Sequence, residues 1–149
     1  MNTQDFSTTL LVEQTPAEVF NAINNVRAWW FGEIEGSTDK LNDEFTYKYE
    51  TFHYTKQKLT EVIPNKKIVW LVTESNLSFV EDKNEWTGTK IIFDITEKDN
   101  KTEVRFTHQG LVPKSECYNE CSNAWSGIVR NNLYKLITKK EKAEKFISI

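Results

Sequence analysis

Residues 15–23 read Thr-Pro-Ala-Glu-Val-Phe-Asn-Ala-Ile, and this segment marks the start of the first helix. Thr15 suits the N-cap, Pro16 suits the first helical position, and Glu18 three residues after the cap completes a capping box. A helix is therefore predicted to begin at Pro16. Its inner stripe would consist of Val19, Phe20 and Ile23.

The segments on either side of this helix have other periods. Residues 6–12 alternate apolar and polar side chains, apart from Leu11, and predict a half-buried strand. After the helix, Asn24-Asn25 predicts a break before a second short turn that ends at Gly32. That turn carries Ala28, Trp29, Trp30 and Phe31.

The middle of the chain has the period of β-strands. Side chains alternate over residues 44–52 and again over 54–62, which is typical of consecutive antiparallel strands. Residues 64–67 predict a turn, and the short apolar run 68–72 that follows predicts a central strand.

Two more strands are predicted further along. Residues 74–88 are interpreted as polar and irregular. Residues 90–96 and 102–108 then alternate again, and the charged segment 97–101 between them is a hairpin connection. We therefore expect six or seven strands in all.

The last segment changes to a helical period. Apolar residues recur at intervals of three and four and predict a long amphipathic helix from about Ser115 to Thr138. Lys139, Lys140 and Lys142 follow, where cations suit the C-terminal end of the helix dipole, so we interpret them as a solvated end. The apolar face consists of Cys117, Cys121, Ala124, Trp125, Ile128, Leu133, Leu136 and Ile137.

Composition narrows the class of protein. A chain of 149 residues with 38% hydrophobic and 28% charged side chains predicts one folded domain over residues 1–149. The net charge of −3, with both signs mixed, argues against nucleic acid as a partner. No basic leader with an apolar run and no bilayer-length stretch is seen, so no membrane partner and a cytoplasmic location are expected.

The order of these segments resembles the START-like (SRPBCC) superfamily. Within it, the sequence is most similar to the Aha-type family, related to the C-terminal domain of the activator of the 90-kilodalton heat-shock protein ATPase. The similarity covers roughly Phe6 to Leu136. The residues that carry it are Thr15 to Ile23, Ala28-Trp29-Trp30, Thr102 to Leu111, and Trp125.

This resemblance implies an α+β helix-grip fold. In that fold a curved antiparallel sheet wraps around the long C-terminal helix and leaves a cavity between them. Families of the superfamily carry lipids, hormones or polyketide intermediates in the cavity. The eukaryotic Aha-type relative binds a chaperone as one domain of a longer protein, so a chaperone is the less favoured partner.

Few residues suggest catalysis or a cofactor. His53 and His108 are the only histidines, and no Gly-x-Ser-x-Gly turn accompanies them. His108 shares a strand face with Val104 and Phe106, where a hydrogen-bonded structural role is favoured over general acid or base work. Glycine-rich phosphate loops are missing. No cofactor is predicted.

The two cysteines fall on one face of the predicted helix. A zinc site would need further ligands that the sequence does not supply at convincing spacing, so no metal is predicted. Two buried thiols are favoured, because free cysteine is among the most buried residue types. Cys117 and Cys121 also make a poor disulfide if both are helical, since the helix would have to distort.

Aromatic side chains are the main functional signal, at 13% of the chain. Large rings that interdigitate incompletely leave space, so a ligand pocket is favoured over a filled core, although a one-residue slip would invert any strand. Trp86 would be an exposed aromatic at a surface hairpin tip, with a loop over the pocket mouth as the alternative. The predicted ligand-binding residues are Trp29, Trp30, Phe31, Tyr47, Tyr49, Trp70, Phe93, Phe106, His108 and Trp125.

The favoured hypothesis is a non-enzymatic protein that binds a small apolar or aromatic molecule between the sheet and the last helix. Tyr47, Tyr49 and His108 would orient that ligand through polar contacts. One alternative is an enzyme of the cyclase, dehydratase or hydrolase type that uses the same cavity. The other is a protein-interaction module related to chaperone ATPase activators.

Overall fold

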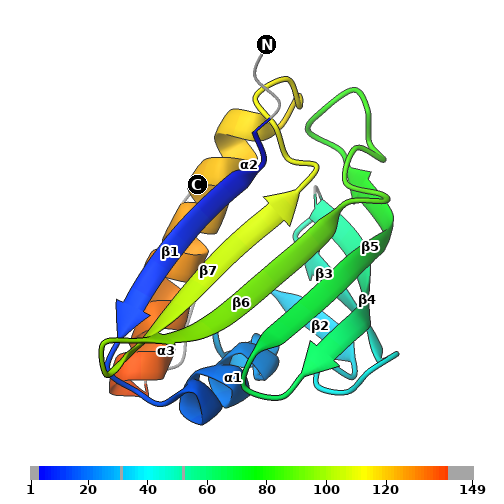
Figure 1. The fold of residues 1–149 in the computed structure, drawn as a ribbon. Helices are drawn as coiled ribbons and strands as arrows, with labels where there is room; N and C mark the ends of the chain where they lie inside the picture. The colour runs from blue at the N-terminus through cyan, green and yellow to red at the C-terminus, as the bar shows by residue number, and fades with distance from the viewer. Residues whose placement is uncertain (1–3, 31, 52, 141–149) are drawn as a thin grey trace.

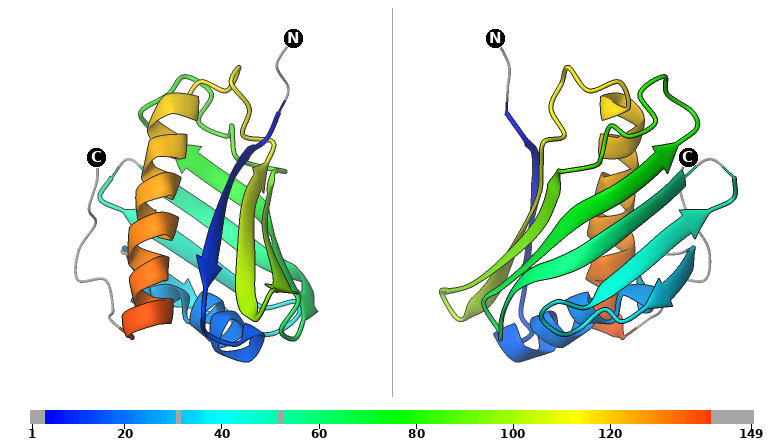
Figure 2. Two further views of the ribbon diagram at one scale, coloured as in Figure 1. Left: turned by 60° about the vertical axis from the view of Figure 1, so that its left-hand side comes forward. Right: turned by 90° about the vertical axis from the view of Figure 1, so that its right-hand side faces the viewer.

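The computed structural model describes residues 4–30, 32–51 and 53–140. One antiparallel sheet contains seven strands in the order β1-β7-β6-β5-β4-β3-β2. The strands are β1 (Phe6–Val12), β2 (Glu33–Gly36), β3 (Glu44–Tyr49), β4 (His53–Ile63), β5 (Lys67–Leu77), β6 (Lys90–Lys98) and β7 (Lys101–Gln109). The sheet curves around a long C-terminal helix, which confirms the predicted helix-grip fold (Figures 1 and 2).

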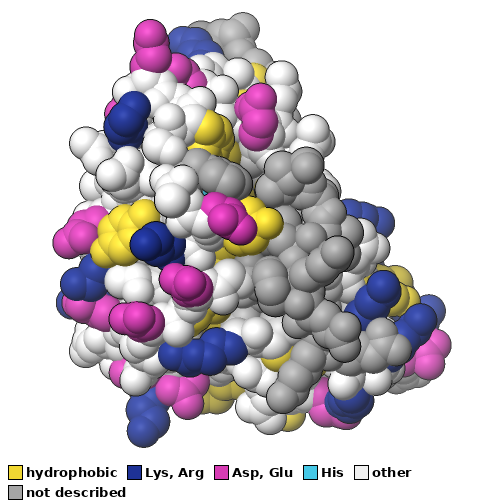
Figure 3. All heavy atoms as spheres, turned by 180° about the vertical axis from the view of Figure 1, so that it is seen from behind, with side chains coloured by type: hydrophobic (Ala, Val, Ile, Leu, Met, Phe, Trp, Pro, Cys, Tyr) yellow, Lys and Arg dark blue, Asp and Glu magenta, His cyan; other side chains and the backbone are white. Residues whose placement is uncertain are grey.

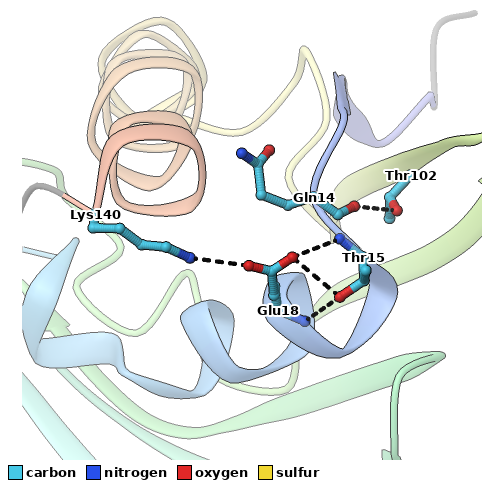
Figure 4. A network of polar contacts seen from close by, with 5 residues as sticks. All are labelled: Gln14, Thr15, Glu18, Thr102 and Lys140. Carbon is cyan, nitrogen blue, oxygen red and sulfur yellow. Dashed lines mark hydrogen bonds and ion pairs between the residues drawn. The ribbon is translucent and has the colours of Figure 1, made fainter.

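The capping box forms as the sequence predicts. Helix α1 (Pro16–Asn24) starts with the Thr15 amide donating to Glu18 Oε1 at 3.0 Å, and the Glu18 amide donates to Thr15 Oγ1 at 3.2 Å (Figure 4). Lys140 Nζ lies 3.3 Å from Glu18 Oε2, so the same carboxylate links α1 to the end of the terminal helix. The Thr15 amide, and then Lys140, lower the pKa of Glu18. Thr102 Oγ1 donates to the Gln14 carbonyl at 2.6 Å and anchors the approach to the helix.

The short elements after α1 also follow the sequence, with one addition. The helix ends at Asn24, and a 3-10 turn (Val26–Ala28) follows, as the Asn24-Asn25 break predicts. Strand β2 was not expected from the sequence. It is only four residues long, and its sequence has no clear strand pattern. Backbone pairing with β3 holds it in the sheet.

The prediction that residues 74–88 are irregular is wrong for the first four of them, residues 74–77. Strand β5 continues to Leu77 because its second half pairs with β4 from Lys56 back to His53. Two register shifts in β4 accompany this long pairing. Cross-strand hydrogen bonds therefore override the weak strand propensity of a polar segment. At the other hairpin, β6 and β7 extend until only Asp99 and Asn100 remain between them, both with positive φ as a tight hairpin turn requires.

The terminal helix is continuous but not uniform. It consists of α2 (Tyr118–Gly127), a π-helical stretch (Ile128–Leu133) and α3 (Tyr134–Lys139). The π-helical stretch buries Asn132, whose Nδ2 donates to the Trp29 carbonyl at 3.1 Å. Lys139 and Lys140 lie exposed at the helix end as predicted, and Lys142 lies outside the described residues.

The prediction of two free thiols is wrong, because Cys117 and Cys121 form a disulfide. The helix begins at Tyr118, later than predicted, so Cys117 precedes it with φ −90° and ψ 10°. This non-helical backbone sets the two Cα atoms 5.4 Å apart, within the range that a disulfide spans. The distortion that a disulfide within a helix would require is therefore confined to Cys117, the residue before the helix.

The core lies between the concave face of the sheet and the terminal helix, with α1 at one end (Figure 2). All five tryptophans are buried in it, none more than 3% exposed. The expectation that Trp86 is exposed is wrong, since the β5–β6 loop turns its side chain into the core. Within the described residues, no helix is long and apolar enough to cross a membrane.

Candidate functional site

The predicted aromatic residues gather in the core. Tyr49 is the half-buried member at the end of β3, and Phe31 lies outside the described residues. Those that are buried and share one hydrophobic cluster are Trp29, Trp30, Tyr47, Trp70, Phe93, Phe106 and Trp125. The strand registers assumed from the sequence therefore hold at these positions.

Trp30 lies at the centre of this cluster. Its ring stacks on Tyr47 with centroids 3.9 Å apart and planes 9° apart. Trp70 is parallel to it at 5.9 Å, and Trp125 from the terminal helix is tilted against it at 5.0 Å. Trp30 thus packs its ring between aromatic side chains of the sheet and Trp125 of the terminal helix.

His108 is held by hydrogen bonds on both ring nitrogens. Trp125 Nε1 donates to His108 Nδ1 at 3.0 Å, and Thr89 Oγ1 lies 2.9 Å from His108 Nε2. The Thr89 hydroxyl donates its hydrogen to the Trp86 carbonyl at 2.6 Å. Thr89 Oγ1 must therefore accept a hydrogen bond from His108 Nε2. His108 is therefore the neutral Nε2–H tautomer. Burial, and then the nearby His53, lower its pKa to about 3.

Trp86, which was predicted to lie on the surface, lies between the two histidines. Its ring meets His53 edge-on at 5.0 Å and His108 at 4.6 Å, and it stacks on Trp125 at 5.8 Å. Its Nε1 donates to Cys117 Sγ at 3.3 Å. The β5–β6 loop therefore closes one end of the interior with an aromatic side chain.

A row of polar side chains on β4 faces the same interior. His53, Thr55 and Gln57 alternate along the strand, and Thr55 and Gln57 are fully buried. Gln57 Nε2 donates to Thr55 Oγ1. The other polar atom of the amide, Gln57 Oε1, takes no part in this hydrogen bond. Polar residues at inward positions of a central strand are unusual unless they have partners.

Three buried polar atoms in this region have no hydrogen-bond partner among the described residues. They are His53 Nε2, Gln57 Oε1 and Trp70 Nε1. Gln57 pairs with Val72 in the β4–β5 ladder and Trp70 pairs with Leu59, so the Gln57 and Trp70 side chains are diagonal neighbours on the inner face. An indole donor and an amide acceptor thus share one part of the interior. Such atoms cost free energy unless water or a ligand satisfies them.

The interior carries no net charge. None of the buried side chains in residues 4–30, 32–51 and 53–140 is acidic, and none is lysine or arginine. Burial lowers the pKa of His53 to about 4, and burial, followed by the charge of Tyr49, raises the pKa of Tyr47 above its usual value. Both histidines and the phenol are therefore neutral at physiological pH. Within the described residues, no group of three His, Cys, Asp or Glu side chains has the arrangement of a metal site.

The polar side chains of the interior extend beyond those predicted. Both ring nitrogens of His108 are hydrogen-bonded within the protein, which is the structural role that the sequence favours for it. His53 and Gln57 were not among the predicted ligand-binding residues, and Trp86 was predicted to lie at a surface hairpin tip. A signal for two of them was present, because His53 and Gln57 alternate in phase with buried Leu59. Trp86 had no such signal, since nothing in a polar loop predicts where its side chain points.

The face of the molecule seen in Figure 3 carries side chains of mixed character. Seen from behind, acidic and basic side chains are interspersed with small apolar areas rather than gathered by type (Figure 3). The large apolar side chains that are exposed belong to Leu11, Leu41, Ile63, Phe79 and Tyr134, which come from separate segments. Scattered exposed apolar residues are normal for a protein surface.

Comparisons with known proteins agree with this fold. The family model described as "Activator of Hsp90 ATPase homolog 1-like protein" matches residues 13–138. No curated protein sequence matches the chain. The solution structure of the Aha1 dimer from Colwellia psychrerythraea is similar with a TM-score of 0.72 and 20% identity, over 90% of this chain and 96% of that one.

Two other solved structures share the fold at low identity. Protein MLL2253 from Mesorhizobium loti has a TM-score of 0.68 and 15% identity, over 87% of this chain and 96% of that one. DynU16, described as a protein in the dynemicin biosynthetic locus, has a TM-score of 0.55 and 14% identity, over 91% of this chain and 49% of that one.

Proposed function

The chain belongs to the family of activator of Hsp90 ATPase homolog 1-like proteins, and we propose that it binds a small, neutral, mainly aromatic molecule between the sheet and the terminal helix. The observation that carries this proposal is a set of three buried atoms that have no hydrogen-bond partner among the described residues, His53 Nε2, Gln57 Oε1 and Trp70 Nε1, in an interior otherwise made mostly of aromatic and aliphatic side chains. A core selected only for stability would place apolar side chains there.

The chemistry of the interior indicates the class of ligand. An interior rich in aromatic rings suits an aromatic ligand, and the absence of charge among the buried side chains of the described residues disfavours an ionised ligand. The ligand should carry one hydrogen-bond acceptor for the Trp70 indole N–H and one donor for the Gln57 amide oxygen. DynU16, which shares the fold, comes from a biosynthetic locus, a setting that is compatible with small organic molecules.

The enzyme alternative has less support at His108. A general acid or base needs a nitrogen that can reach the substrate, and both His108 nitrogens are engaged with Trp125 and Thr89. His53 is the histidine that retains a buried nitrogen without a partner among the described residues. We therefore assign His53 the role of orienting the ligand.

The first experiment is native mass spectrometry of freshly purified protein, followed by denaturing extraction and identification of any small molecule released. A stoichiometric adduct with the neutral, aromatic character described above is the expected result. A protein without an adduct that also shows no shift in a thermal screen of aromatic compounds would contradict the proposal. It would favour the interaction-module reading, which a pull-down with a chaperone of the Hsp90 class would then test.

The variant Gln57→Leu tests whether the Gln57 amide contributes to ligand binding or to folding. The substitution removes an amide oxygen that has no partner among the described residues, which should offset the loss of the Nε2 hydrogen bond to Thr55, so stability should change by no more than about 1 kcal/mol, while affinity for the extracted ligand should fall about tenfold. Tyr54→Phe is the matched control, because Tyr54 is on the same strand with its hydroxyl on exposed Glu74 at 3.3 Å. Equal affinity in both variants, or loss of folding in Gln57→Leu, would show that the amide has a structural role instead.

A further inference from the structure

We propose that Cys117 and Cys121 form a reversible thiol–disulfide site, and that reduction of this bond by a small dithiol releases the loop that carries Trp86. The site lies where the β5–β6 loop meets the start of the terminal helix. The release of the loop is independent of any ligand. Its consequence for ligand access rests on the proposed function above.

Trp86 connects the disulfide to the interior. Its indole N–H donates to Cys117 Sγ at 3.3 Å, while its ring packs against both histidines and Trp125. Cys117 is fully buried and Trp86 is 3% exposed, so little space separates them from their neighbours. A change in the position of the Cys117 sulfur is therefore transmitted directly to the indole ring.

Two reciprocal carboxylate contacts hold the loop to the same place. The Glu85 carboxylate accepts from the Glu116 amide at 2.6 Å and from the Cys117 amide at 3.2 Å. In return, the Glu116 carboxylate accepts from the Glu81 amide at 3.2 Å and from the Asp82 amide at 2.8 Å. All four hydrogen bonds depend on the backbone at residues 116 and 117. The disulfide fixes that backbone by tying Cys117 to the first turn of α2.

The reduction is an ordinary thiol–disulfide exchange. One thiolate of the dithiol attacks Sγ of Cys121, the cysteine that keeps some exposed surface (5% of the residue), and the S–S electron pair leaves with Cys117 Sγ, which takes a proton from solvent. The second thiolate of the dithiol then attacks the mixed disulfide, and Cys121 leaves as a thiolate that is also protonated. The dithiol is oxidised to its cyclic disulfide, and the protein gains two electrons and two protons.

Reduction changes the packing around Trp86. Two thiols in van der Waals contact occupy more space than a covalent sulfur pair, and Cys117 Sγ already touches Trp86 Nε1. Cys117 also becomes free to leave its present backbone conformation, on which the Glu85 contacts depend. Because the bond spans a sequence separation of only 4, it constrains little of the unfolded chain, so the effect is local rather than global.

Coupling between the bond and the loop works in both directions. If reduction favours the open loop, then opening the loop must favour reduction by the same factor. On the proposed function, the open loop would expose the His53 side of the interior, and a ligand that packs under Trp86 would protect the disulfide. The site would then make ligand release depend on the thiol–disulfide balance of the surroundings.

Hydrogen exchange of the full chain, oxidised and then reduced with dithiothreitol, tests the proposal. Amides of residues 79–89 should exchange about tenfold faster after reduction, while amides of β6 and β7 stay within about twofold. The double variant Cys117→Ser, Cys121→Ser should show the exchange rates of the reduced protein, and dithiothreitol should not change them. Its far-UV circular dichroism should equal that of the wild type.

Three results would overturn the proposal. The first is unchanged exchange of residues 79–89 after complete reduction. The second is faster exchange of the loop and of β6 and β7 together, which would mean global unfolding. The third is failure of Cys117 and Cys121 to pair again on air oxidation, judged by alkylation and mass spectrometry. None of these readouts uses a ligand, so they test the thiol–disulfide site independently of the proposed function.

Discussion

Acidification from about pH 7.5 to about pH 5 should remove about 3 kcal/mol of folding stability, because His53 and His108 stay neutral in the folded protein. Burial lowers their pKa values from 6.5 to about 4 and about 3. Below pH 6.5 the unfolded chain binds a proton at each histidine, whereas the folded chain does not. Stability is therefore fully present above pH 6.5 and declines as the pH falls toward 4.

The magnitude follows from the size of the two shifts. Each unit of pH below 6.5 costs about 1.4 kcal/mol per fully shifted histidine, so His108 alone accounts for about 2 kcal/mol at pH 5. His53 is partly exposed as a residue although its Nε2 is buried. Solvent beside the ring weakens its effect, and we assign it about 1 kcal/mol.

Urea unfolding at a series of pH values measures this loss through tryptophan fluorescence, since all five reporters are buried. His53→Gln serves as the internal control and should reduce the loss by the share of that one histidine. Proton NMR of the imidazole rings reads each pKa directly. A folded protein in which either ring titrates near 6.5, or whose stability stays constant over this window, would refute the reasoning.

Other predictions concern local contacts, and each is tested by urea or thermal unfolding. Thr15→Ala should cost about 1 kcal/mol, because the first turn of α1 loses its side-chain acceptor; no loss would mean that water replaces the cap. Trp125→Phe should cost about 2–3 kcal/mol, since His108 Nδ1 loses its buried donor, and a change below about 0.5 kcal/mol would contradict that hydrogen bond. Gly32→Ala should cost about 1–3 kcal/mol, because the added Cβ would lie 2.5 Å from the Tyr47 ring; an unchanged midpoint would show that the ring can yield.

The regular elements could be predicted because their signals are local. The strand over Phe6–Val12 and the helix start at Pro16 match the predicted positions, since alternation and capping are decided by neighbouring residues. The prediction ended β5 too early, because pairing with β4 extends it to Leu77 and no property of the polar segment itself signals that. Strand β2 was missed for the same reason.

The burial of the aromatic side chains could be predicted from the sequence. Trp30, Trp70 and Trp125 face inward as their periods indicate. The polar part was not predictable in the same way, because it depends on which atoms remain without partners after folding. His108 is satisfied by Thr89 and Trp125, and that fact cannot be read from the spacing of residues in either strand or helix.

The residues of the chain were enough to predict the capped first helix and an interior lined with tryptophans, because both depend on side-chain patterns within each element. The helix-grip fold was predicted from the resemblance to the START-like superfamily, and the curved seven-stranded sheet with its terminal helix confirms it. Contacts between distant segments determine that Trp86 enters the interior, that Cys117 and Cys121 are bonded, and that His53 keeps a buried nitrogen without a partner among the described residues. Each of these outcomes depends on the position of a loop or of a helix start, which contacts with distant segments of the chain determine. Such long-range contacts produce no periodic pattern in the sequence.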